Sequence, residues 1–251
     1  MTDSDEQAQL PPAGTAWVGV EVGTEAQPQL VRWSVWYPPG HARGARWGLF
    51  HESYALRTPT GTVLIDPARP EAAAERRVRD LVEAMGGRPL ASILTNDNHE
   101  RDAYYFREAY GVPVWGPAAG EESYEGLPDH LYDERQPLPG ELLAIKIEGR
   151  HLSDRCLLGE ATGGTRVLFV GDTLDGQHHE FDPRGFPGGP HAEPGLYLGV
   201  SGKYARGAKD RAQFKASLGR LLAHDFDIVC PAHDRPYRDN PKAELARPLG
   251  G

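Results

Sequence analysis

A short apolar run gives way to a crowded polar loop between residues 93 and 102. The sequence there is Ile93-Leu94-Thr95-Asn96-Asp97-Asn98-His99-Glu100-Arg101-Asp102. An amphipathic segment at 103–106 follows directly. In layered α/β proteins, site residues collect where strands end, because loops can converge there without disturbing the core. We therefore take residues 95–102 as the first candidate for a functional loop.

Strand patterns precede this stretch. Alternating apolar residues predict strands at 18–22 and 30–36, and a hairpin whose strands include 54–56 and 63–65. The clearest helix is predicted at 71–85, because it has apolar residues at helical spacing and is followed by a pair of glycines. The N-terminal part is thus mostly β-structure that leads into a helix.

Helices and short strands alternate after the stretch, which indicates α/β layering. Helices are predicted at 102–110 and 209–224. Strands are predicted at 93–94, 112–115, 142–147, 166–170, 196–200 and 227–230. Residues 176–195 are rich in Gly, Pro and His and predict a long loop, of a length that is often functional.

The composition indicates one soluble domain. Of 251 residues, 36 are Asp or Glu and 27 are Lys or Arg, so the formal net charge is −9. Since nucleic-acid binding requires clustered cations, no nucleic-acid partner is expected. Residues 1–14 predict a flexible tail and residues 15–251 a single domain. The sequence gives no oligomeric state.

The predicted location is the cytoplasm. No apolar run approaches the ~20 residues that cross a bilayer, and no signal-peptide core is present, so no membrane partner is expected. Cys156 and Cys230 are far apart in sequence and do not form a disulfide framework. Each lies among apolar residues and is predicted to be a small buried hydrophobe.

Polar clusters follow several of the predicted strands. They are residues 95–102, Gly171-Asp172-Thr173, Ala232-His233-Asp234 and His151. Histidine nitrogen together with carboxylate oxygen suits zinc, iron or manganese. An aspartate between two cations can bridge them, and the bound water becomes a strong nucleophile. The clusters therefore predict a metal site.

Six segments occur in an order that resembles the metallo-β-lactamase superfamily. They are the hairpin at Tyr54, Val63-Leu64-Ile65-Asp66-Pro67, Ile93-Leu94-Thr95, His151, Phe169-Val170-Gly171-Asp172-Thr173-Leu174 and Cys230-Pro231-Ala232-His233. Each is weak alone, and the order and spacing carry the resemblance, which covers residues 50–237. It implies an αββα sandwich, with two mixed β-sheets face to face and flanking helices. Members of this superfamily include thioester hydrolases, lactonases, nucleases and lactamases.

The superfamily's T-H-x-H-x-D-H motif is degenerate in this chain. Its usual ligand positions correspond here to Asn96, Asn98, Glu100, Arg101, His151, Asp172 and His233. An asparagine oxygen is a much poorer zinc ligand than imidazole. An arginine is always charged and cannot coordinate, and ~4 Å from a dication it would be repelled by a few kcal/mol. A full dinuclear centre is therefore not expected.

We predict at most one well-held divalent metal: zinc, iron or manganese. The resemblance implies that His151, Asp172 and His233 bind it, with help from His99 or Glu100. His99 is one residue out of register with the family motif, and bending of the loop could bring it in as a ligand. In that hypothesis a metal-bound hydroxide attacks an ester, thioester, lactone or phosphoester.

The predicted catalytic residues are Asp172, His99 and Arg101. Arg101 would orient an anionic group of a small-molecule substrate. His179, in the long loop, and Lys203, after the strand at 196–200, are further candidates for substrate binding.

The second hypothesis is a binding protein that has the same fold but no catalytic activity. In it, an ion pair between Arg101 and Asp172 replaces the metal, no cofactor is bound, and the protein holds a small anion or a partner. The loss of ligands at Asn96 and Asn98 favours this hypothesis, and the retained Asp172 opposes it. We favour the enzyme.

Some of these residues could have purely structural roles instead of roles in a functional site. Asn98 or Asp102 could be the N-cap of the next helix, and Asp172 could be a turn aspartate that accepts backbone N–H bonds. Asp172 and Asp175 superficially resemble a haloacid-dehalogenase loop, but that loop needs aspartates two residues apart after the first strand. The sequence has no glycine loop of nucleotide-binding type.

Overall fold

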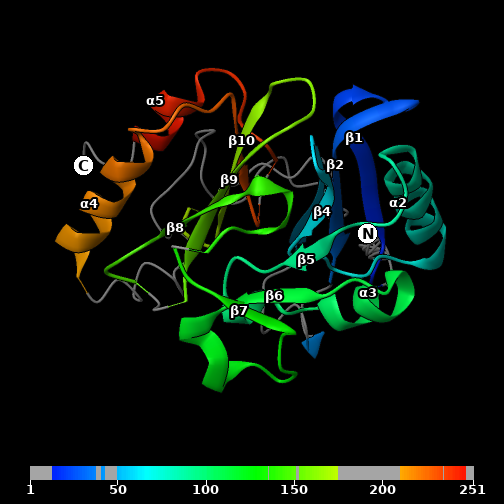
Figure 1. Cartoon of the computed structure of the whole chain (residues 1–251), viewed down its shortest axis with the longest axis horizontal. Helices are drawn as coiled ribbons and strands as arrows, with labels where there is room; N and C mark the ends of the chain where they lie inside the picture. Colours follow the sequence, from blue (N-terminus) through cyan, green and yellow to red (C-terminus); the bar gives the residue numbers. More distant parts are fainter. Residues whose placement is uncertain are drawn as a thin grey trace, which may run out of the picture.

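A computed structural model of the chain describes residues 13–37, 41–42, 50–134, 136–150, 153–174, 210–233 and 235–246. Two β-sheets lie face to face in the middle of the molecule, and helices cover their outer faces (Figure 1). The order of layers is helix, sheet, sheet, helix. The predicted αββα sandwich is confirmed.

The first sheet has seven strands in the order β1-β2-β3-β4-β5-β6-β7. They are β1 (Ala16–Thr24), β2 (Gln27–Trp36), β3 (Phe50–Thr58), β4 (Gly61–Ile65), β5 (Ala91–Ile93), β6 (Val114–Pro117) and β7 (His130–Tyr132). Strands β1 to β4 pair antiparallel, and β4 to β7 pair parallel. The parallel part brings the carboxyl ends of β4 and β5 to the same edge.

The second sheet has four strands in the order β11-β10-β9-β8. They are β8 (Leu143–Lys146), β9 (Arg155–Glu160), β10 (Arg166–Gly171) and β11 (Ile228–Pro231). Strands β10 and β11 are parallel, and the other pairs are antiparallel. Both sheets are therefore mixed, and the carboxyl ends of β10 and β11 lie side by side.

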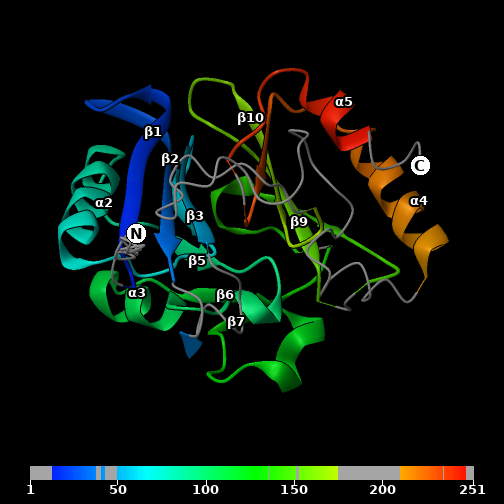
Figure 2. The same cartoon turned by 180° about the vertical axis from the view of Figure 1, so that it is seen from behind.

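Helices α2 (Ala72–Ala84) and α3 (Ala103–Tyr110) cover the first sheet, and α4 (Arg211–Leu221) and α5 (Pro241–Ala246) cover the second (Figure 2). Three short 3₁₀ helices are η1 (Asp97–His99), η2 (Ala118–Ser123) and η3 (Pro139–Glu141). Asp210 is the N-cap of α4, and its carboxylate accepts the N–H groups of Ala212 and Gln213.

Alternate residues of each strand fill the core between the sheets and the layer under the helices. On β4, Val63 and Ile65 point between the sheets, while Leu64 packs under α2. The core between the sheets also contains Leu30, Tyr54, Leu56, Ile93, Leu157, Val167 and Phe169. This packing holds the ends of β5, β10 and β11 close together.

Most predicted elements are present within a few residues of their expected bounds. Strands β7 and β9 were missed: β7 is only three residues long, and β9 has an apolar centre without alternation. Cys156 and Cys230 are buried and free, as expected. The strand expected at 196–200 and residues 1–12 lie outside the described residues.

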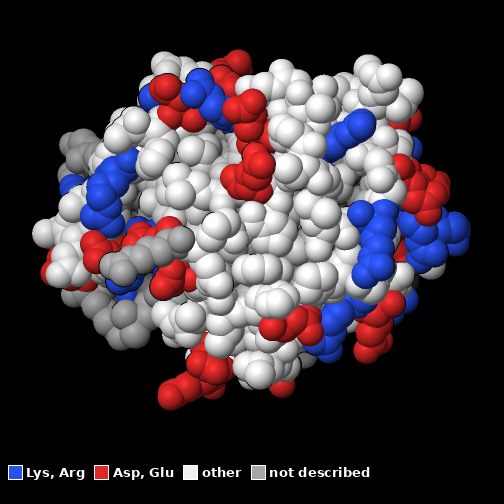
Figure 3. All heavy atoms as spheres, in the orientation of Figure 1, with Lys and Arg blue, Asp and Glu red and all other residues white. Residues whose placement is uncertain are grey.

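Acidic and basic side chains are interspersed on the face of the molecule shown in Figure 3. Within the described ranges, no helix is long and apolar enough to cross a membrane. The expected absence of a nucleic-acid partner stays a prediction.

Candidate metal centre

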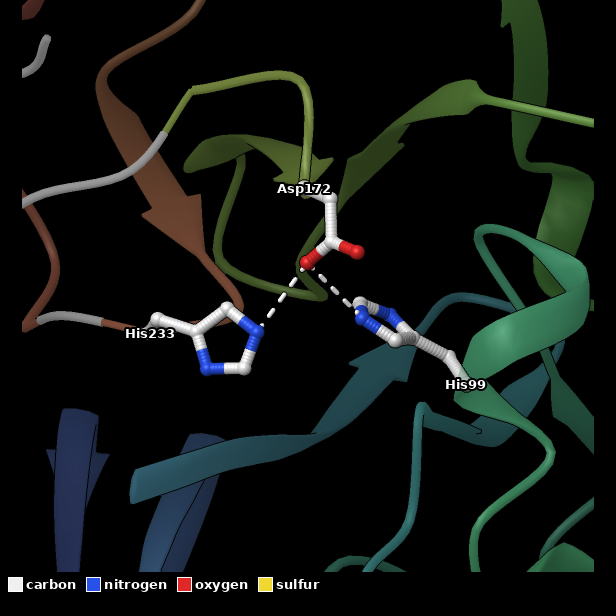
Figure 4. Close-up of side chains that lie close together, drawn as sticks. All are labelled: His99, Asp172 and His233. Carbon is white, nitrogen blue, oxygen red and sulfur yellow. Dashed lines mark hydrogen bonds and ion pairs between the residues drawn. The ribbon is translucent and has the colours of Figure 1, made fainter. Parts of the chain in front are cut away.

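Three polar side chains meet where strands of the two sheets end. His99 lies in η1, after the end of β5, Asp172 directly follows β10, and His233 follows β11. The strand ends bring together residues 73 and 61 positions apart in the chain. In Figure 4 both imidazole rings point toward the carboxylate of Asp172.

One oxygen of Asp172 faces both histidines. Its Oδ1 lies 2.9 Å from Nε2 of His99 and 3.1 Å from Nε2 of His233. These side chains offer three possible ligand atoms that all lie within 4.8 Å of one another. His99 and Asp172 are buried, and His233 is partly exposed. Such a cluster has the spacing of a metal-binding triad.

The other ring nitrogen of each histidine, Nδ1, has a polar partner on the side of the ring that faces away from Asp172. Nδ1 of His99 lies 2.8 Å from Oδ2 of Asp66, an oxygen that also accepts the hydroxyl of Thr95. Nδ1 of His233 donates to the carbonyl oxygen of Phe50 at 2.6 Å. A carbonyl only accepts, so this bond places the proton of His233 on Nδ1. Fixing of Nδ1 in this way is the usual outer arrangement of metal-binding histidines.

The local charges determine the protonation of the cluster without a metal. Burial and the charge of Arg101 lower the pKa of His99, but Asp172 and Asp66 together raise it to about 9. Burial raises the pKa of Asp172, but His99 and His233 outweigh this effect and bring it well below its usual value. His99 is therefore an imidazolium between two carboxylates at neutral pH.

The cluster fits a divalent cation. Nε2 of His233 is buried and makes no hydrogen bond, although it lies close to Asp172. A cation held by this nitrogen and by Oδ1 of Asp172 would give both atoms a partner. Two imidazoles and one carboxylate are a donor set that zinc and iron accept.

Solved structures similar to this chain include metallo-β-lactamases. The metallo-β-lactamase DIM-1 gives a TM-score of 0.61 at 13% identity, with 96% of this chain and 97% of that chain covered. An enzyme from Pontibacter korlensis gives 0.61 at 14% identity, and IND-7 gives 0.59 at 14% identity. In both comparisons the match covers 94% of this chain and 98% of the other chain. The chain has the metallo-β-lactamase fold.

No family model and no curated protein matches the sequence. At these identities the structural likeness establishes the metallo-β-lactamase fold alone. The chemistry must be argued from the site itself.

Arg101 does not take the place that the binding-protein hypothesis gave it. Its Nη1 donates to the backbone carbonyls of Glu52, at 3.0 Å, and Asp66, at 3.4 Å. Within the described part of the chain it forms no ion pair with Asp172. The backbone of Arg101 is left-handed, with φ of 35°, which redirects its side chain. The ion pair of the second hypothesis is therefore not formed.

Glu100, at the motif's aspartate position, points away from the triad. Its carboxylate accepts the backbone N–H groups of Glu125, at 2.9 Å, and Gly126, at 3.4 Å. It therefore fastens the loop after η2 to the motif. His99 and Glu100 were both predicted as additional metal ligands. Only His99 points toward Asp172, because neighbouring residues of a 3₁₀ turn point in different directions.

The competing helix-cap roles are not observed. Asp102 precedes α3 but makes no side-chain capping bond, and its Oδ2 instead accepts the N–H of Arg69 at 2.7 Å. No hydrogen bond joins Asn98 to the triad among the described residues. Three predicted site residues, His151, His179 and Lys203, lie outside the described residues.

Sequence reasoning missed three residues around the triad. Asp66 was noted as the end of a hairpin, yet it ends β4 beside the parallel β5, and this adjacency could have predicted its contact with His99. Asn96 was considered only as a lost ligand, but it donates to Asp172. Arg150 is buried against the backbone carbonyls of Asp172 and Thr173, and no motif signalled it.

Proposed function

We propose that this chain is a metal-dependent hydrolase with one divalent cation held by His99, Asp172 and His233. The observation that carries the proposal is the convergence of two imidazole Nε2 atoms on one carboxylate oxygen, with both Nδ1 atoms fixed from behind. Zinc, iron and manganese all suit the donors. The substrate would be an ester, thioester, lactone or phosphoester.

A divalent cation held by these residues would supply Lewis acidity toward a carbonyl or phosphoryl oxygen and would lower the pKa of a bound water toward neutral pH. The residues of the chain hold the geometry for it. Asp66 fixes the ring of His99, and the Phe50 carbonyl fixes that of His233. Because His99 carries a proton in the metal-free protein, its Nε2 must release that proton when the ring becomes a ligand.

Charge balance supports an anionic small-molecule substrate. With neutral imidazoles, a dication and Arg101 outweigh Asp66 and Asp172 by one positive charge. Nε and Nη2 of Arg101 are buried and make no hydrogen bond, and this edge of a guanidinium matches an oxyanion. His179 and Lys203 keep the substrate-binding roles proposed from the sequence.

Metal analysis of protein purified without chelator tests the proposal. We expect about one metal per chain and an increase in thermal stability on adding zinc, iron or manganese. His233→Ala should lose the metal, while His130→Ala, which changes an exposed histidine on β7 outside the triad, should keep it. Less than about 0.2 metal per chain, with no thermal shift, would overturn the proposal; micromolar affinity predicts a shift of a few kcal/mol in excess metal. Metal-loaded protein should then be assayed with carboxylated esters, thioesters, lactones and phosphodiesters.

A further inference from the structure

The side chain of Asn96 lies against the carboxylate that the two histidines share. Its Nδ2 donates to Oδ2 of Asp172 at 3.2 Å, and the side chain is buried. The other oxygen, Oδ1, faces His99 and His233. The two oxygens of Asp172 therefore have separate partners: the amide takes one and the triad takes the other.

The usual role of an asparagine at this place is helix capping, and Asn96 does not perform it. Its backbone is extended, with φ of −157° and ψ of 175°, immediately before η1, but its side chain makes no capping bond. The amide is directed instead at Asp172 and also lies 3.5 Å from Oδ1 of Asp154. A buried amide group needs hydrogen-bond partners, and the partners of Nδ2 are the carboxylates of Asp172, in the triad, and Asp154, beside it.

Asp154 and Arg150 continue this contact back to the backbone of Asp172. Nε of Arg150 lies 3.4 Å from Oδ2 of Asp154. Nη1 of Arg150 donates to the carbonyl oxygens of Asp172 and Thr173. The side chains of Asn96, Asp154 and Arg150 are all buried. Asp172 is thus held at its side chain by Asn96 and at its backbone by Arg150.

We infer that Asn96 is a positioning residue of the metal centre. The last torsion of an aspartate is broad, so a carboxylate without an outer partner can rotate its plane away from the two imidazoles. The hydrogen bond from Asn96 selects one orientation and presents Oδ1 to both imidazoles. This inference rests on the proposed metal function, because it assigns a role toward the same cation.

Binding of Co²⁺ tests the inference without any assay of activity. Asn96→Ala removes the donor, and Asn96→Asp keeps the shape but replaces the amide by a carboxylate. Loss of an outer partner typically weakens metal affinity 10- to 100-fold, and we expect both variants to fall in that range with altered visible Co²⁺ spectra. Asn98→Ala is the matched control, since it removes the same residue type two positions along the loop. It should bind like the wild type.

A double-mutant cycle in chelated protein gives a second readout. Asn96→Ala and Asp172→Ala should be coupled by roughly tenfold in the unfolding equilibrium, as expected for a hydrogen bond to a charged group. Additive effects, or a wild-type affinity and spectrum in Asn96→Ala, would overturn the role of Asn96 and leave the metal centre standing. If the wild-type protein itself takes up no Co²⁺, the proposed function fails, and the positioning role fails with it.

Discussion

The two histidines of the triad face the same oxygen of Asp172 but are supported differently. His99 is buried and backed by the carboxylate of Asp66, whereas His233 is partly exposed and backed by the carbonyl of Phe50. A carbonyl fixes the tautomer of an imidazole without adding charge. A carboxylate also stabilises the imidazolium. The imidazole of His99 is therefore held by a charged acceptor, and that of His233 by an uncharged one.

The shared carboxylate should matter most, because both sides depend on it. Asp172→Asn removes the charge that His99 and His233 face, and we expect loss of metal uptake. Breaking a buried pair leaves the other charge unpaired and costs about 3 to 5 kcal/mol of unfolding free energy. Urea denaturation and metal analysis measure both effects.

The exposed Asp80→Asn on α2 is the matched control and should leave both quantities unchanged. Metal uptake by Asp172→Asn at the wild-type level would remove Asp172 from the centre.

The chelated protein should become less stable as pH rises, because His99 then loses a proton that stabilises the folded state. Its pKa is raised to about 9 from an ordinary value of 6.5, so its contribution is complete below 6.5 and is lost as pH rises through 9. A shift of that size corresponds to at most about 3 kcal/mol. The pKa of Asp172 is lowered, so its contribution is present above 3.8 and is lost as pH falls further.

Urea midpoints of chelated protein between pH 5 and pH 10 test this comparison. With zinc bound the trend should reverse, because binding releases the proton of His99 and becomes tighter as pH rises. A flat profile for the chelated protein would show that His99 is neutral between its two carboxylates. His99→Gln should remove most of the slope above pH 6.5.

The sequence predicted where the site lies better than which side chains enter it. Asp172 and His233 follow strands whose ends must meet at one edge, so their convergence follows from topology. The directions of His99, Glu100 and Arg101 depend on a 3₁₀ turn and on a left-handed residue after it. Strand periodicity carries no information about such a turn. That is why Glu100 was predicted to help bind the metal, and why the second hypothesis paired Arg101 with Asp172.

The support behind His99 should have a smaller effect than its shared ligand. Asp66→Asn keeps the shape and tolerates the left-handed φ of 46°, but it removes the charge behind the ring. We expect metal affinity to fall roughly 10- to 100-fold and the pKa of His99 to decrease. Titration of His99 by NMR and competition for zinc measure the two.

An unchanged zinc affinity in Asp66→Asn would mean that the negative charge of Asp66 does not contribute to metal binding. The partner of His233 is the backbone oxygen of Phe50, which no side-chain substitution removes. Asp66→Asn is therefore the variant that tests how the two histidines differ in their support.

The smallest expected effect concerns Arg101, which touches neither histidine by a hydrogen bond. Arg101→Lys keeps the charge near His99 and removes the guanidinium edge formed by Nε and Nη2. If that edge binds an anionic group, kcat/KM should fall about tenfold for a carboxylated substrate and stay unchanged for its uncharged analogue. The loss should appear mainly in KM, because the contact lies away from the reacting bond. An equal loss for both substrates would mean that Arg101 supports the fold through the carbonyls of Glu52 and Asp66, and that the edge meets no substrate.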